Sequence, residues 1–262
     1  MLVAFKKAFD SVPHDTLSIT MLDMGFPAHF VSLLMHLYKR QKAKVKTASV
    51  VSGWFSVMKG VQQGCMLSPH LFIILLEAVM RETLDGYTGG LRIGGRTVTN
   101  LRYADDVVDI ATSQSDLHEL VDRLNRASQK YGLEINIDKT KIMATQNIIH
   151  ITTSGTPVEK VETVTYLGSL FTQEAKCDND IKAKLGKGQG LLSSLRTLWK
   201  SHSIGIATKI RPLQSLVWPV VSYGCESWTL KSTDEDRIKS FEMKTFRQIL
   251  RVTWMDKWTN DW

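Results

Sequence analysis

Two adjacent carboxylates interrupt an otherwise apolar stretch, NLRYADDVVDI, at residues 100–110. Asp105 and Asp106 repel one another, and burying either costs several kcal/mol unless a cation or hydrogen bonds compensate it. In a straight strand the two side chains would face opposite sides, so both reach one ion only where the chain turns. The stretch therefore predicts a β-hairpin with its turn at the aspartates, which either hold a metal ion or are simply solvated turn formers.

Composition narrows the class of protein without fixing its function. With 262 residues and 43% apolar content, the chain can form one large domain or two smaller ones around a real core. Its net charge of +7 fits a polyanionic partner or an ordinary basic surface. Three distant cysteines and no apolar run long enough to cross a bilayer predict an intracellular protein, cytoplasmic or nuclear, without a disulfide framework, zinc site or membrane partner.

Hydrophobic periodicity predicts an α+β chain. The expected elements are a strand in MLVAFKKAF, a helical hairpin over 14–41, strands at 43–50 and 55–57, a helix over 69–84, a β meander over 91–111 and a helix over 114–132. From residue 178 the pattern becomes helical. This shift predicts a boundary near residue 175, between an α+β body at 1–175 and a helical domain at 176–262.

Five blocks give the aspartate pair a context, and they follow in the order FKKAFDSVPH, GVQQGCMLSPHLF, YADD, GLEINIDKTK and YLGSLF. This order resembles the palm motifs of reverse transcriptases from non-long-terminal-repeat (LINE-type) retrotransposons. The RTE-like group is the most similar, since its C-terminal sequences resemble PVVSYGCESWTL and FEMKTFRQILRVTW. The resemblance implies a right-hand polymerase with an antiparallel palm sheet and packed helices at 1–175, a helical thumb at 176–262, and fingers largely absent.

The same resemblance implies RNA-directed DNA synthesis by nucleotidyl transfer with two magnesium ions, Mn²⁺ being the alternative metal. Asp105 would be a metal ligand and Asp106 its supporting acid, since carboxylate oxygens suit Mg²⁺. The implied partners are an RNA template, a DNA primer or RNA–DNA duplex, and deoxynucleoside triphosphates. The oligomeric state stays open.

Four residues are expected beside the incoming nucleotide. Phe9 matches the bulky residue under the sugar, Gln63 and Gly64 match the loop beside the nucleotide, and Lys139 matches a lysine near the triphosphate. Each has a plainer alternative, because Phe9 suits an aromatic core position, the Gln-Gly pair suits a simple loop before a helix, and Lys139 suits a solvated strand edge.

Primer and template contacts are expected further along the chain. Tyr166, Leu167 and Gly168 match the hairpin that grips the primer terminus, although a strand turn at Gly168 explains them equally well. Lys200 and Arg211 stand for a set of basic thumb residues that would follow the duplex backbone. The aromatic residues among them have helical spacing, which favours a core, so only the charged faces should meet nucleic acid. The wider basic set comprises Arg196, Lys209, Lys239, Lys244, Arg247 and Arg251.

One position departs from the family pattern. The residue before FKKAFD should be an aspartate that completes the metal site, but here it is Ala4. Asp10 lies six residues further on and is not expected to replace it, because a ligand misplaced by about 1 Å can cost roughly a hundredfold in rate. We therefore expect impaired catalysis or, alternatively, an inactive retrotransposon remnant that at most binds RNA or RNA–DNA duplex. Without fingers, the MLVAF strand is also expected to expose apolar surface.

Overall fold

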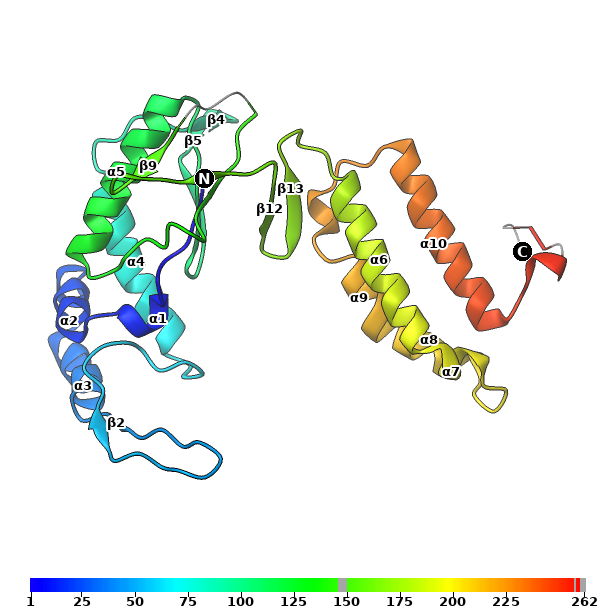
Figure 1. The fold of residues 1–262 in the computed structure, drawn as a ribbon, viewed down its shortest axis with the longest axis horizontal. Coiled ribbons are helices and arrows are strands. Elements are labelled where there is room, and N and C mark those ends of the chain that lie inside the picture. Colours follow the sequence, from blue (N-terminus) through cyan, green and yellow to red (C-terminus); the bar gives the residue numbers. More distant parts are fainter. Residues whose placement is uncertain (146–149, 257, 260–262) are drawn as a thin grey trace. The chain divides into compact units, whose positions relative to one another are not determined.

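The chain divides into two compact units, Met1–Val161 and Glu162–Trp262, in a computed structural model that describes residues 1–145, 150–256 and 258–259 (Figure 1). Each unit has its own hydrophobic core. The division lies earlier in the chain than the boundary expected near residue 175, because the hairpin at residues 163–172 packs against the first long helix of the second unit. The α+β class is confirmed, with a mixed first unit and a mainly helical second unit.

A five-stranded sheet organises the first unit, in the order β11-β8-β1-β7-β6. Its neighbouring strands are antiparallel except for β8 and β11. The remaining strands pair as the hairpins β2–β3, β4–β5 and β9–β10. The strands are β1 (Leu2–Val3), β2 (Lys42–Ala43), β3 (Phe55–Ser56), β4 (Leu91–Ile93), β5 (Arg96–Val98), β6 (Asn100–Tyr103), β7 (Asp106–Asp109), β8 (Lys141–Ile142), β9 (Thr152–Thr153), β10 (Thr156–Pro157) and β11 (Glu159–Lys160).

Helices supply most of the first unit's core. α4 and α5 lie side by side, and α2 packs on α4 (Figure 1). In α5 the predicted apolar face is confirmed, since Leu117, Leu120, Val121 and Leu124 are all buried. The helices are α1 (Ala8–Ser11), α2 (His14–Asp23), α3 (Ala28–Lys39), α4 (Ser68–Leu84) and α5 (Gln114–Lys130).

The N-terminal strand lies in the middle of the sheet. β1 pairs with β7 on one side and β8 on the other, and Met1, Val3 and Phe5 are buried. The expectation of exposed apolar surface at this strand was therefore wrong. The strand is also shorter than predicted, because Lys7 takes a left-handed conformation (φ 44°) and α1 begins at the next residue.

The predicted strand at 43–50 is largely irregular, since only its first residue, Ala43, belongs to a strand, β2. The strand predicted at 55–57 is present as β3, which pairs with β2. Val45, Val50 and Val51 are exposed in the described part of the chain, so no packed layer reinforces the pairing.

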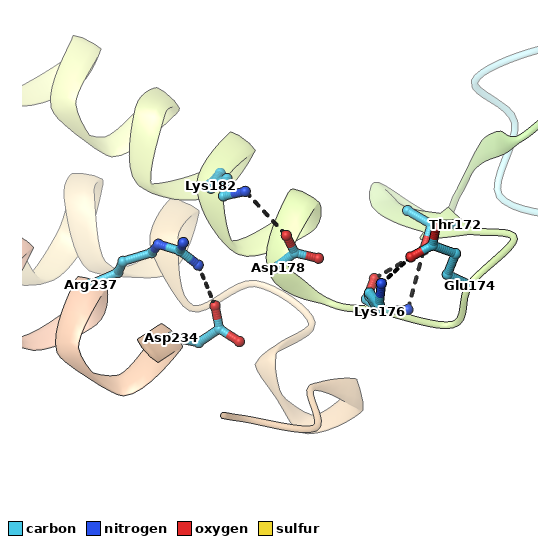
Figure 2. A network of polar contacts seen from close by, with 7 residues as sticks. All are labelled: Thr172, Glu174, Lys176, Asp178, Lys182, Asp234 and Arg237. Atoms are coloured by element: carbon cyan, nitrogen blue, oxygen red, sulfur yellow. Dashed lines mark hydrogen bonds and ion pairs between the residues drawn. The ribbon is translucent and has the colours of Figure 1, made fainter. Parts of the chain in front are cut away.

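The second unit joins one hairpin to a set of helices. Its core centres on Trp199, which is fully buried and donates its indole N–H to the Leu192 carbonyl at 2.9 Å. Ion pairs lie near the starts of two helices (Figure 2). Lys182–Asp178, at 3.1 Å, is accessible to solvent, whereas Arg237 pairs at 2.7 Å with the buried Asp234. The elements are β12 (Thr163–Tyr166), β13 (Ser169–Thr172), α6 (Asp178–Ser194), α7 (Arg196–Lys200), α8 (Ile206–Pro212), α9 (Trp218–Val221) and α10 (Ser232–Leu250), with a π-turn at Leu213–Val217. Among the described residues, every helix is too short or too polar to cross a lipid bilayer.

Candidate functional site

The aspartate pair lies at the tip of the β6–β7 hairpin, as predicted. The ladder ends at the pair Tyr103–Asp106, which leaves Ala104 and Asp105 as the two turn residues. Ala104 has a φ of 52°, a left-handed conformation that closes the tight turn. Asp105 is half-buried and Asp106 is exposed, so both carboxylates are accessible at one end of the sheet.

Ala4 lies beside this turn. β1 pairs with β7 through Leu2–Val108 and Val3–Val107, and continuing the register by one residue sets Ala4 across from Asp106. Directly opposed residues of an antiparallel pair have Cβ atoms about 5 Å apart. A carboxylate at position 4 would therefore adjoin Asp106, whereas the alanine methyl supplies no ligand atom.

The turn at residues 136–140 forms hydrogen bonds with the backbone of Ala4. The Asn136 amide donates to the Ala4 carbonyl at 2.7 Å, and the Ala4 amide donates to the Thr140 hydroxyl at 3.3 Å. Lys139 lies in the same turn, where its amide donates to the Asn136 carbonyl at 3.2 Å and its side chain is exposed. The fold thus brings the turn that carries Lys139 next to the strand that carries Ala4.

Phe9 lies on α1, and its ring faces the core. The ring stacks on Phe72 of α4 with centroids 5.1 Å apart and planes inclined by 25°. Phe9 is half-buried and packs against the core, so the core role is observed while part of the residue stays accessible. The Phe9 carbonyl also accepts the Val61 amide at 2.8 Å, which joins α1 to the loop before α4.

That loop carries Gln63 and Gly64, both exposed. Gly64 has a φ of 86°, a backbone conformation that residues other than glycine rarely adopt. A Cβ built on it would meet no atom within 4 Å. α4 then begins at Ser68 with Pro69 in its first turn, as predicted. The glycine serves the turn, and the space outside it is open to a ligand.

The electrostatics of the turn favour binding a cation. Burial, and then the negative charge of Asp105, raise the pKa of Asp106. Two carboxylates suit one Mg²⁺ held jointly with the phosphates of a nucleotide. Among the described residues there is no group of three or more His, Cys, Asp or Glu placed to hold a metal.

A third aspartate lies on the opposite face of the same strand. Asp109 is buried, and both of its carboxylate oxygens lack a hydrogen-bond partner. Burial raises its pKa to about 7, although the nearby Met1 ammonium opposes the shift. Asp109 therefore belongs to the core and not to the candidate site.

The structure adds a supporting residue that the sequence motifs did not reveal. Glu77 of α4 accepts from Arg102 of β6 at 2.7 Å and from Arg81 at 2.9 Å. Burial alone would raise the pKa of Glu77, but the two arginines outweigh it and lower that pKa. The ion pair ties the aspartate hairpin to α4, and the signal was a lone acid in the apolar run LFIILLEAVM.

The expected primer and template residues belong to the second unit. Tyr166, Leu167 and Gly168 form the end of β12 and the turn before β13. Lys200 and Arg211 are exposed, and Lys200 lines a surface pocket of about 540 Å³ with Arg196, Thr197 and Ser201.

Two members of the wider basic set instead form hydrogen bonds with backbone carbonyls inside the second unit. Lys209 is buried and donates to the Trp199 carbonyl at 2.8 Å, while Arg251 donates to the Trp199 and Ser201 carbonyls. Burial, then the charge of Arg251, lower the pKa of Lys209. Both side chains donate hydrogen bonds to carbonyls at the C-terminal end of α7. The expectation that Lys209 lies on a charged outer face was therefore wrong.

Known proteins similar to this chain include reverse transcriptases of retrotransposons. Residues 1–171 match the family described as reverse transcriptase (RNA-dependent DNA polymerase). A Pol polyprotein from the type-1 retrotransposable element R2 of Nasonia vitripennis is 32% identical over 53% of the chain, and a probable RNA-directed DNA polymerase from transposon X-element of Drosophila melanogaster is 24% identical over 97%. The aligned parts cover 13% and 28% of those two proteins.

Among solved structures, a telomerase from Candida albicans, determined with a fragment of telomeric RNA, aligns with 95% of the chain and 43% of its own length at 12% identity and a TM-score of 0.48. The two relatives named above come from the R2 and X elements and do not identify a subgroup for this chain, so the RTE-like subgroup stays a prediction. The family match covers more than half of the chain and includes the aspartate hairpin, the Gln-Gly loop and the Lys139 turn. The chain therefore belongs to the reverse transcriptase family, of the kind found in non-long-terminal-repeat retrotransposons.

Proposed function

We propose that the first unit is the palm of an RNA-directed DNA polymerase and that Asp105 and Asp106 form its remaining metal-binding carboxylates. One observation carries the proposal: the β1–β7 register, continued by one residue beyond Val3, sets Ala4 across from Asp106, where a third carboxylate would complete the cluster. Mg²⁺, or Mn²⁺, is the cofactor expected for such oxygen ligands. When bound, such ions neutralise charge on the attacking and leaving oxygens of nucleotidyl transfer.

The other residues of the first unit would bind and orient the nucleotide. Gln63 and Gly64 would offer an accessible loop beside the triphosphate, and the half-buried Phe9 would lie under the sugar. Lys139, on the turn bonded to Ala4, would place its ammonium near the phosphates. Deoxynucleoside triphosphates are therefore the proposed substrates, copied against an RNA template.

The second unit would act as the thumb. Its Tyr166–Gly168 turn would contact the primer terminus, while Lys200 and Arg211 would contact phosphates of the primer–template duplex. Both cations are exposed, as such contacts require.

We further propose that Ala4 impairs catalysis in this chain. Two carboxylates leave the charge of two divalent ions poorly balanced, and ligand errors near 1 Å already cost roughly a hundredfold. Restoring the carboxylate with Ala4→Asp should therefore raise the rate of DNA synthesis by about a hundredfold or more.

Primer extension on an RNA template tests this proposal, with Mg²⁺ or Mn²⁺ and deoxynucleotides. The wild-type chain is compared with Ala4→Asp and with the matched control Ala4→Asn, which adds a similar side chain without the charge. Extension by Ala4→Asp alone is the expected result. Equal extension by the wild type would refute the assigned lesion, and silence from all three chains would refute the palm as proposed for this chain.

A second candidate function is a catalytically inactive remnant that binds RNA or RNA–DNA duplex. The favouring observation is the net charge of +7 together with the missing carboxylate at position 4. A gel-shift titration with an RNA–DNA duplex separates the candidates when combined with the extension assay. Salt-dependent binding by the Ala4→Asp chain without any extension would favour the remnant.

A further inference from the structure

The tip of the β12–β13 hairpin is a two-residue turn that packs against a distant segment. Leu167 and Gly168 both have positive φ, 48° and 79°, which defines a tight hairpin turn. A Cβ built on Gly168 would lie 3.1 Å from the ring of Tyr223. The glycine therefore serves the turn and also lets the Tyr223 ring lie against it.

A buried ion pair stands behind this contact. Asp180 and Lys184 of α6 are buried, with Lys184 Nζ and Asp180 Oδ2 3.0 Å apart. The Asp180 carboxylate accepts the Leu170 amide of β13 at 2.9 Å and the Trp228 indole N–H at 2.8 Å. One carboxylate thus holds the hairpin and the segment 223–228 together.

Lys184 also bonds both to the hairpin and to the segment 223–228. Its ammonium donates to the Ser169 hydroxyl at 3.2 Å and to the Tyr223 carbonyl. It also lies 5.3 Å from the centroid of the Tyr223 ring and 5.5 Å from that of Trp228, within the range of cation–π attraction. Burial alone would raise the pKa of Asp180, but hydrogen bonds from Leu170, Trp228 and Lys184 outweigh it and lower that pKa.

We propose that Asp180, Lys184 and Trp228 are positioning residues, which hold the Tyr166–Gly168 turn in the conformation that receives the primer terminus. This inference rests on the proposed function, in which that turn contacts the primer. It also explains the conspicuous SYGCESW stretch: Tyr223 covers the turn and Trp228 fixes the carboxylate behind it.

The test uses Trp228→Phe in the full chain, since it removes the indole N–H and keeps an aromatic ring. Trp199→Phe is the matched control, because it removes another indole donor of the same unit, one that bonds to Leu192. Amide hydrogen exchange should accelerate at Leu170, whose amide donates to Asp180, in Trp228→Phe only, while α10 keeps its protection.

The functional readout is binding to an RNA–DNA duplex with a recessed DNA 3′ end, compared with the same duplex made blunt. Wild type should prefer the recessed end. In Trp228→Phe the ratio of the affinities for the recessed and the blunt duplex should fall about tenfold, which corresponds to the free energy of one strong hydrogen bond. Its affinity for the blunt duplex should stay unchanged. A role in stability alone would weaken both duplexes equally.

Several results would overturn the inference. Unchanged exchange at Leu170, or a loosened hairpin with an intact preference for the recessed end, would each refute it. A wild-type chain without any preference would refute the primer contact in the proposed function, and the inference with it. If Trp228→Phe fails to fold by circular dichroism, Tyr223→Leu replaces it, because Tyr223 is 55% exposed as a residue and its ring still lies against Gly168.

Discussion

Asp106 and Asp180 both lie beside a β-hairpin, but their charges are compensated in different ways. Asp180 is buried and receives donors from Leu170, Trp228 and Lys184. Asp106 has Asp105 as its neighbour, and neither carboxylate makes a hydrogen bond or ion pair within the described residues. The charge of Asp180 is balanced without a ligand, whereas the Asp105–Asp106 pair is stabilised by a cation supplied from outside.

The difference separates structural from binding carboxylates. In the second unit, an internal lysine balances the charge and fixes a hairpin. In the first unit, like charges stay together at an accessible turn, an arrangement expected where a metal ion has a role. Asp109 is a third case, since its buried carboxylate makes no hydrogen bond and its charge therefore opposes folding.

The largest expected effect on stability comes from removing one partner of the buried Asp180–Lys184 ion pair. Lys184→Met should lower the free energy of unfolding by about 3–5 kcal/mol, because it leaves the Asp180 charge buried without a cation. Urea denaturation measures the loss. Lys182→Met, which removes the exposed pair with Asp178 seen in Figure 2, should leave stability within error. Equal effects of the two variants would refute the contrast between buried and exposed pairs.

Asp109 should make stability depend on pH. Its pKa is raised from 3.8 to about 7 in the folded chain, so its favourable contribution is complete below about pH 4 and is lost as the pH rises through 7. A shift of this size corresponds to at most about 4 kcal/mol. Asp109→Val should therefore stabilise the chain at pH 8 and flatten the curve of unfolding free energy against pH.

The control for this experiment is Asp106→Asn, at the exposed end of the same strand. It should keep most of the wild-type pH dependence. Destabilisation by Asp109→Val at pH 8 would show instead that the buried carboxylate has a stabilising partner.

The smallest expected effect concerns the aspartate turn itself. Asp105→Asn removes the neighbouring charge and should lower the pKa of Asp106 toward its ordinary value, leaving only the contribution of burial. Carbon-13 NMR of the Asp106 carboxyl across a pH titration measures the change. Asp85→Asn removes an exposed acid elsewhere in the first unit and should have no such effect. An unchanged Asp106 titration in Asp105→Asn would show that the two carboxylates do not interact.

Local patterns predicted the parts of the fold that depend on neighbouring residues. The apolar spacing of α5, the helical hairpin α2–α3 and the turn at the aspartates are all present. Each follows from periodicity or turn chemistry within a short window. The ordered motifs likewise identified the family, since residues 1–171 match it.

The features that sequence reasoning missed depend on long-range partners. β1 reaches the middle of the sheet only because β7 and β8 flank it from far along the chain. Lys209 is buried because its ammonium meets the end of α7, and Trp228 meets Asp180 across 48 residues. No local pattern distinguishes such residues from ordinary surface lysines or core aromatics.

The most direct test of the incomplete metal site is Mn²⁺ binding, measured from the electron paramagnetic resonance signal of the free ion. The account predicts that Ala4→Asp binds Mn²⁺ about tenfold more tightly than wild type, and that adding Asp106→Asn cancels the gain. Such coupling would show that position 4 and Asp106 share one ion. Equal affinity in wild type and Ala4→Asp would contradict the claim that Ala4 occupies the place of a lost ligand.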